Sequence, residues 1–298
     1  MQRDRASAAG SDGAAAAPGA LAIICGGGTF PAAVADAVAK SGRRLVMFGL
    51  RNWADAALIE RYPHHWIAIG QLGRFLRLAH EEQCSEVLLI GTLMRPSLSA
   101  VRLDWRTLCL LPRIVRAFRG GDDHLLSAVA RMIEAGGLRV IGVEQVAAEI
   151  MAPLGVLGSV QPTERDRSDI ARALALIAAM GPFDVGQAAI VADNHVLAVE
   201  AAEGTDNMLL RIGEMRRQRR VVNAAGVGVL VKAPKPGQDR RFDLPSIGTR
   251  TVENAIAAGL AGIAVAAGST IVADPGETIA CADRARMFVV GVAAGAPQ

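Results

Sequence analysis

Short apolar runs alternate with amphipathic stretches along the first half of the chain. The runs have the length of buried strands, and the stretches between them have the apolar spacing of helices. Strands are predicted at residues 21–25, 44–48, 65–69, 85–90 and 138–141, and helices at residues 29–40, 71–83 and, with an interruption at 119–123, 104–131. This alternation predicts a Rossmann-like parallel sheet flanked by helices.

The second half of the chain follows a different pattern. Apolar runs at residues 187–192 and 195–199 flank Asp193-Asn194, which is typical of a β-hairpin turn. Further strands are expected at residues 228–232, 263–272 (a strand pair around Gly268) and 287–292, and helices at residues 169–180, 205–217 and 251–260. Gly204 or Thr205 is expected to cap the second of these helices. The pattern predicts a second domain of mixed α/β type.

Residues 153–162 contain several glycines and prolines and show no apolar periodicity. Because this is typical of a segment between domains, we place the domain boundary there. We expect an N-terminal domain over residues 20–152 and a catalytic C-terminal domain over residues 153–298. Residues 1–19 are rich in alanine, glycine and serine and are expected to form a disordered tail.

Composition narrows the class of protein. The 298 residues are 51% hydrophobic and 20% charged, enough apolar material for the cores of two domains. A net charge of +3 without a long basic run gives no indication of nucleic-acid binding. The basic segment 211–220 is predicted as a solvated helix face, with contact to anionic lipid as the weaker reading. Four scattered cysteines favour a reduced, cytoplasmic protein with buried thiols. Neither a membrane-spanning stretch nor a secretory signal is predicted.

Three glycines follow the first predicted strand. Gly26, Gly27 and Gly28 lie before a helix, where bare backbone N–H groups can bind an anion. A tight turn without a ligand is the alternative. The loop lacks the lysine of a P-loop and the acidic residue of a dinucleotide fingerprint, which weakens the hypothesis of a nicotinamide oxidoreductase.

Polar residues follow other elements of the first half. Thr92 and Arg95 come after a predicted strand, and ligands collect at the carboxyl ends of parallel strands. Arg95 is equally compatible with an exposed position. Asp122 and Asp123 follow two glycines and are compatible with a site or with capping of the next helix.

Carboxylates and lysines gather in the second half. Glu200, Glu203 and Asp206 lie within seven residues, more than a helix cap needs. Asp243 lies in an apolar Phe-Asp-Leu-Pro setting, where a carboxylate needs a partner or a metal. Such oxygens suit Mg²⁺ or Mn²⁺. The lysines at the end of another predicted strand, Lys232 and Lys235, can bind a phosphate. These residues predict a metal-assisted reaction at a phosphate.

Several motifs follow one another along almost the whole chain. They occupy residues 26–31, 91–96, 121–126, 184–187, 198–206, 232–236 and 242–248. Together they resemble the LpxI family, the UDP-2,3-diacylglucosamine pyrophosphatases of lipid A biosynthesis. The resemblance covers residue 20 to about residue 293, and the N-terminal tail is the main departure from the family.

The resemblance implies a homodimer of two-domain α/β chains with the substrate held between the domains. It implies Mg²⁺-dependent hydrolysis of a lipid-linked UDP-sugar, in which water attacks the α-phosphorus and releases UMP and 2,3-diacylglucosamine 1-phosphate. Because this substrate is a two-chain lipid made at the cytoplasmic face, transient contact of the protein with the inner membrane is a further hypothesis. The main alternative is a non-catalytic nucleotide-sugar or lipid-binding protein.

The resemblance also assigns residues. Asp243 matches a position that is catalytically essential in the family, as a metal ligand or as a base. The family positions predicted to line the substrate site are matched by Asp122, Asp123, Gln187, Thr205, Asp206, Lys232 and Lys235. The sequence pattern by itself adds Gly26, Gly27, Gly28, Thr92 and Arg95 to this site, and Glu200, Glu203 and Asp206 as further metal ligands.

Overall fold

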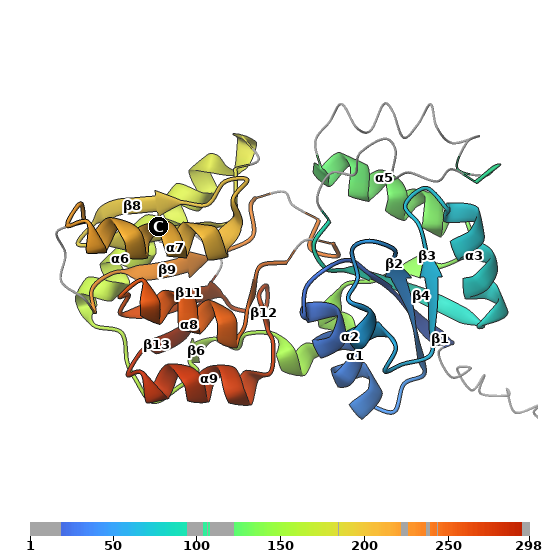
Figure 1. Cartoon of the computed structure of the whole chain (residues 1–298), viewed down its shortest axis with the longest axis horizontal. Coiled ribbons are helices and arrows are strands. Elements are labelled where there is room, and N and C mark those ends of the chain that lie inside the picture. Colours follow the sequence, from blue (N-terminus) through green and yellow to red (C-terminus); the bar gives the residue numbers. More distant parts are fainter. Residues whose placement is uncertain are drawn as a thin grey trace, which may run out of the picture.

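The computed structural model describes most of the chain as two α/β lobes (Figure 1). The described residues are 19–93, 104–105, 107, 122–183, 185–221, 226–236, 239–242 and 244–293. The predicted tail therefore lies outside the described residues except for Gly19. We call the part built on the five-stranded sheet the N-terminal lobe and the part built on the six-stranded sheet the C-terminal lobe.

A five-stranded parallel sheet forms the N-terminal lobe. Its strand order is β3-β2-β1-β4-β5, which is the Rossmann order, and the prediction of a Rossmann-like sheet is confirmed. The strands are β1 (Ala20–Cys25), β2 (Leu45–Leu50), β3 (His64–Ile67), β4 (Cys84–Ile90) and β5 (Arg139–Val140). The helices are α1 (Phe30–Lys40), α2 (Ala56–Ile59), α3 (Leu72–Glu81) and α5 (Asp122–Glu134), with short turns η2 (Val143–Gln145) and η3 (Ala148–Ile150). Most of the helical segment predicted at residues 104–131 lies outside the described residues, and α5 is its described end.

Alternate residues of this sheet face two separate cores, because successive side chains of a strand point to opposite faces. The α1-side core contains Leu21, Ile23, Met47, Val34 and Val38. The α3-side core contains Ala22, Val46, Phe48, Phe75 and Ile133. The strands are therefore buried on both faces, as the continuous apolar runs predicted.

A six-stranded mixed sheet forms the C-terminal lobe, in the order β6-β13-β11-β9-β7-β8. Strands β9, β11 and β13 are parallel, whereas β7 runs antiparallel to both β8 and β9, and β6 runs antiparallel to β13. The strands are β6 (Gly155–Val156), β7 (Ala188–Ala192), β8 (His195–Val199), β9 (Val229–Lys232), β11 (Gly262–Ala266) and β13 (Phe288–Val292). The predicted mixed α/β unit is confirmed.

Helices cover both faces of the C-terminal sheet. Met208 of α7 (Gly204–Arg217), Val252 of α8 (Thr249–Ala257) and Cys281 of α9 (Pro275–Arg284) share one core with the sheet. Ile170 and Ile177 of α6 (Glu164–Met180), which is followed by the turn η4 (Gly181–Phe183), pack in a second core. The sequence interpretation did not include α9.

The hairpin predicted at Asp193-Asn194 is confirmed. Both residues have a positive φ, 56° and 60°, which the two central positions of a type I′ turn require. The buried carboxylate of Asp169 accepts the backbone N–H groups of both residues, at 3.0 and 2.6 Å. Helix α6 thus holds the turn that joins β7 to β8.

Three local predictions were wrong. Helix α6 begins at Glu164 rather than at Asp169, because Thr163 and Asp166 form a capping box. Neither Gly204 nor Thr205 caps α7: its N-cap is Glu203, which makes no side-chain cap bond. The two strands around Gly268 do not pair with each other, because β12 (Ile271–Val272) pairs instead with β10 (Ser246–Ile247) in a separate two-stranded sheet.

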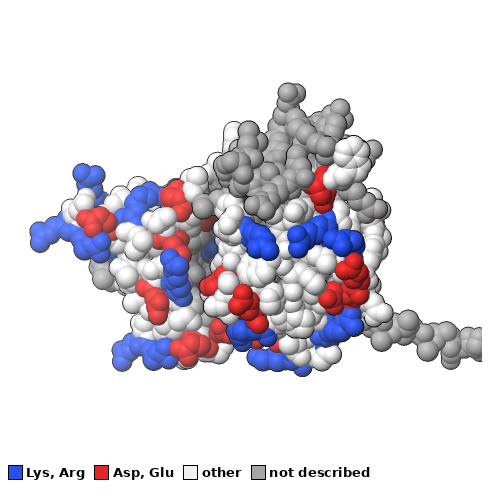
Figure 2. Space-filling view, turned by 45° about the vertical axis from the view of Figure 1, so that its right-hand side comes forward, with Lys and Arg blue, Asp and Glu red and all other residues white. Residues whose placement is uncertain are grey.

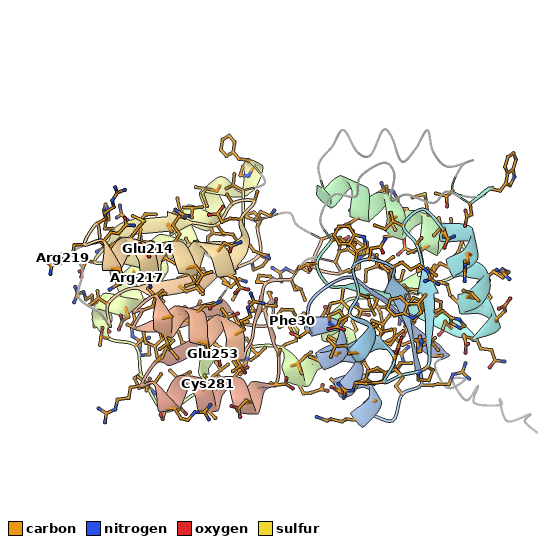
Figure 3. All side chains as sticks on the ribbon, viewed as in Figure 1. Phe30, Glu214, Arg217, Arg219, Glu253 and Cys281 are labelled. Carbon is orange, nitrogen blue, oxygen red and sulfur yellow. The ribbon has the colours of Figure 1, made fainter. Side chains whose placement is uncertain are left out.

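The segment around β12 joins the two lobes. The side chain of Ile271 packs in the α1-side core of the N-terminal lobe. Ala152 donates its N–H to the Thr270 carbonyl and accepts the N–H of Gly268, both at 2.8 Å. In Figure 3, Phe30 at the start of α1 lies on the side of its lobe that faces the C-terminal lobe.

The surface and the thiols agree with the composition. Figure 2 shows basic and acidic residues interspersed over the visible face, rather than a continuous basic surface among the residues described there. Cys25, Cys84 and Cys281 are buried and free, as predicted, and Cys109 lies outside the described residues. Burial raises the pKa of the Cys84 thiol to about 11, so the thiol stays protonated at neutral pH. Within the described ranges, we find no helix with the length and apolarity needed to cross a bilayer.

Candidate functional site

The glycine loop lies at the point where the strand order of the N-terminal sheet reverses. Gly27 and Thr92, which follow the neighbouring strands β1 and β4, exchange two backbone hydrogen bonds of 2.9 Å. In a doubly wound sheet, the crevice between two such strands is the usual place of a ligand. The structure therefore brings together the predicted residues Gly26, Gly27, Gly28 and Thr92.

Close packing explains the first of these glycines. A Cβ atom on Gly26 would lie 2.7 Å from the carbonyl oxygen of Thr92, closer than real Cβ contacts. The N–H of Gly26 is donated to Ile90 and that of Gly27 to Thr92, each at 2.9 Å. The expectation of bare N–H groups is thus wrong at these two residues. An anion at this place would meet Gly28, whose φ is +90°, and the start of α1.

A second group of predicted residues meets at one end of the C-terminal sheet. Glu200, directly after β8, is only 7% exposed. One of its carboxylate oxygens accepts the backbone N–H of Gln187 at 2.8 Å, and the other accepts the hydroxyl of Thr205 at 2.6 Å. Glu200 thereby links the entry to β7, the exit from β8 and the first turn of α7.

The side chain of Gln187 has an unsatisfied oxygen. Its Oε1 atom is buried and has no hydrogen-bond partner among the described residues. Buried polar atoms are almost always paired, and an unpaired one calls for an explanation. A ligand with an N–H or O–H group would provide the missing donor.

Lys232 ends β9 beside this group. It pairs in register with Ala188, and Ala188 accepts the backbone N–H of Glu200 at 2.9 Å, so the three residues lie on adjacent strands. Lys232 is only 5% exposed as a residue, and its ammonium donates to the carbonyl of Ser246 at 2.9 Å. Lys235 follows in the connection from β9 to β10 and is half-buried.

The other two carboxylates of the predicted cluster, Asp206 and Glu203, contact different residues from those that Glu200 contacts. Asp206 accepts the Asn254 amide at 2.9 Å and pairs with Arg250 at 3.2 Å. Glu203 pairs with Arg211 at 2.7 Å. A hydrogen bond from its own backbone N–H, together with Arg211, lowers the pKa of Glu203. Each carboxylate is therefore engaged by its own protein donors.

These contacts are relevant to the prediction that the three carboxylates bind a metal ion. In the part of the chain that the structure describes, acidic, histidine and cysteine side chains form no group of three that suits a metal ion. Glu200, Glu203 and Asp206 consequently do not fit a shared metal centre.

Four predicted site residues lie wholly or in part outside the described structure. Asp243 and Arg95 lie outside the described residues, and Asp122 and Asp123 begin α5 with side chains that are not described. The neighbours of Asp243 are described: Phe242 packs against the α3-side core and Leu244 against the α1-side core. Both neighbours are therefore anchored on the N-terminal lobe.

Comparison with known proteins identifies the family. A model of the LpxI N-terminal domain matches residues 20–150, and a model of the LpxI C-terminal domain matches residues 153–290. The chain belongs to the LpxI family. It is 41% identical over 272 residues to the UDP-2,3-diacylglucosamine pyrophosphatase LpxI of Caulobacter vibrioides, covering 91% of this chain and 97% of the relative.

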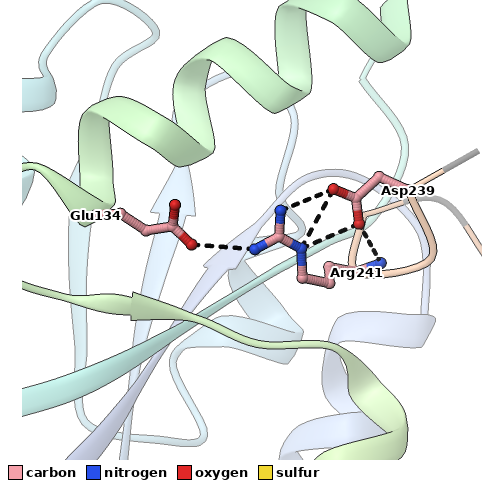
Figure 4. Close-up of polar contacts among 3 residues, drawn as sticks. All are labelled: Glu134, Asp239 and Arg241. Atoms are coloured by element: carbon pink, nitrogen blue, oxygen red, sulfur yellow. Dashed lines mark hydrogen bonds and ion pairs between the residues drawn. The ribbon is translucent and has the colours of Figure 1, made fainter.

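Sequence reasoning missed one polar cluster, which connects α5 to the residues before Asp243. Arg241 pairs with both Glu134 and Asp239 (Figure 4). Arg241 and Asp239 share a short stretch with Asp243, but Glu134 is 107 residues away. No local pattern in the sequence signals such a contact.

Proposed function

We propose that this chain hydrolyses the diphosphate of UDP-2,3-diacylglucosamine and releases UMP and 2,3-diacylglucosamine 1-phosphate. The observation that carries the proposal is the near full-length match to a relative that is named for this pyrophosphatase activity. Membership of the LpxI family over both lobes supports it. The reaction belongs to lipid A biosynthesis, and the chain would be a hydrolase.

In the proposed reaction, water attacks the α-phosphorus and UMP carries the new oxygen. A diphosphate repels an approaching nucleophile, so positive groups near its oxygens lower the barrier. Lys232, at the end of β9, and Lys235, in the connection after it, would supply such charge. Gln187 and the loops after β1 and β4 would bind the rest of the substrate from the two lobes.

Asp243 is the residue proposed to act at the reacting centre. It would orient and deprotonate the attacking water or bind a metal there, and only the first role requires a pKa near the operating pH. We also propose that the hydrolysis depends on Mg²⁺ or Mn²⁺. A divalent cation would neutralise charge on the diphosphate, with Asp243 as its ligand from this chain.

The proposal is tested by incubating the purified chain with UDP-2,3-diacylglucosamine, with Mg²⁺ or with a chelator, and identifying the products by mass. We expect UMP and 2,3-diacylglucosamine 1-phosphate from the wild type and neither from Asp243→Ala. Tight binding of the substrate without any product would instead identify a non-catalytic binding protein.

We further propose that the chain works as a cytoplasmic homodimer that contacts the inner membrane transiently. The two-chain lipid substrate supports the membrane contact, since the enzyme must take such a lipid from a bilayer. The mass of the protein in solution tests the dimer.

A further inference from the structure

Arg241 connects two parts of the chain that are far apart in sequence (Figure 4). Its guanidinium donates to Glu134 in the last turn of α5, with Nη1 and Oε1 separated by 3.0 Å. The same guanidinium also donates to both carboxylate oxygens of Asp239. Its Nε lies 3.0 Å from Oδ1 and 3.2 Å from Oδ2, and its Nη2 lies 2.8 Å from Oδ2. The backbone N–H of Arg241 also donates to Asp239 at 3.1 Å.

The residues after Arg241 are anchored by apolar contacts to the same lobe. The guanidinium carbon of Arg241 lies 5.0 Å from the centre of the Phe242 ring, within the range of a cation–π contact. Phe242 and Leu244 pack against the cores on opposite faces of the N-terminal sheet. A segment that belongs to the C-terminal half of the sequence is thus attached to the N-terminal lobe on both sides of Asp243.

We propose that Arg241 is a positioning residue for the hydrolysis. Its ion pair with Glu134 holds the chain directly before Asp243 on the N-terminal lobe, while its hydrogen bonds to Asp239 restrain residues 239–241. This inference rests on the proposed function, since it assigns Arg241 a role in the turnover of the same site.

The expected effects on rate and on stability distinguish a positioning residue from a residue that only stabilises the fold. The side chains of Arg241 and Glu134 are 35% and 39% exposed, and an ion pair with that exposure adds little to stability. Misplacing a reacting group by about 1 Å, in contrast, can cost about a hundredfold in rate. Loss of the pair should therefore lower kcat strongly and leave the melting temperature almost unchanged.

The experiment compares Glu134→Gln, Arg241→Gln and Arg241→Lys with the wild type. The matched control is Glu277→Gln, which removes another surface ion pair, Glu277 with Arg284 at 2.9 Å. Turnover of UDP-2,3-diacylglucosamine and hydrogen exchange of peptides that cover residues 239–244 are measured for each variant.

We expect Glu134→Gln and Arg241→Gln to lose about tenfold or more in kcat, with KM changed less than about threefold. Exchange should rise in the 239–244 peptides, and Arg241→Lys should recover part of kcat because it keeps the charge opposite Glu134. Glu277→Gln should match the wild type in both measurements.

Unchanged kcat in Arg241→Gln, or a loss that simply follows the fraction of unfolded protein, would overturn the proposal. If the wild type does not hydrolyse the substrate, the proposed function fails and the positioning role fails with it. Hydrogen exchange still reports on the ion pair between Arg241 and Glu134 in that case. Faster exchange in Glu134→Gln would confirm that this pair holds residues 239–244, and equal exchange would refute it.

Discussion

At the scale of single residues, Glu200 shows how a carboxylate predicted to bind metal can have a different task. Its two oxygens accept the Gln187 N–H and the Thr205 hydroxyl inside the protein. From the sequence, Glu200 could be predicted to follow a strand. The sequence did not indicate that its two partners would be Gln187, 13 residues before it, and Thr205, 5 residues after it.

Glu200→Ala tests this structural role. Alanine removes both acceptor oxygens and leaves the Gln187 N–H and the Thr205 hydroxyl without their acceptor, so we expect a loss of about 1–3 kcal/mol in the free energy of unfolding. Urea denaturation measures the loss. If Glu200 were a metal ligand instead, the variant would need more Mg²⁺ for activity and keep its stability.

Gln187→Leu tests the unpaired oxygen of Gln187. We expect KM for the UDP-sugar to rise by about two- to tenfold, since one hydrogen bond contributes about 0.5–1.5 kcal/mol. Stability should stay equal or increase, because a buried polar atom without a partner in the described chain is removed. An unchanged KM would show that Gln187 does not contact the substrate.

At the scale of elements, the hairpin β7–β8 was predictable because Asp193-Asn194 tolerates the positive φ of its turn. The support of that turn by Asp169 was not predictable, because it depends on the packing of α6 against β7. The start of α6 was missed although Thr163 and Asp166 carry a capping signal. The pairing of β12 with β10 was missed because two-residue strands have almost no pattern of their own.

Asp169→Ala tests the contribution of α6 to the hairpin. Two backbone N–H groups lose their acceptor, so the free energy of unfolding should fall by about 1–3 kcal/mol, as measured in urea. Ser168→Ala is the control, since the exposed Ser168 hydroxyl donates to the Asn194 side chain rather than to the turn backbone. Equal effects of the two substitutions would contradict this role of Asp169.

At the scale of the whole molecule, the motifs and the strand–helix alternation were enough to predict two α/β lobes and the family. They could not predict how the lobes meet. The ion pair of Arg241 with Glu134 and the packing of Ile271 in the N-terminal core join residues more than a hundred positions apart. Such contacts follow from the completed fold rather than from local sequence.

The proposed membrane contact makes a prediction at this scale. Arg217 and Arg219 lie at the end of the C-terminal lobe away from the N-terminal lobe, so neutralising them should leave the chemistry intact (Figure 3). Replacing Arg217, Arg219 and Arg220 with glutamine should weaken sedimentation with anionic liposomes, by about 1 kcal/mol of binding free energy for each charge near the surface. Turnover of a short-chain, water-soluble substrate is the control. Equal sedimentation of variant and wild type would count against docking through this segment.

Hydrolysis in isotopically labelled water tests the central claim most directly. The wild type, given UDP-2,3-diacylglucosamine and Mg²⁺ in H₂¹⁸O, should place the label in UMP if water attacks the α-phosphorus as proposed. Asp243→Ala should give no labelled product while it still binds the substrate. Label in 2,3-diacylglucosamine 1-phosphate would contradict the proposed point of attack, and the absence of both products from the wild type would contradict the proposed activity.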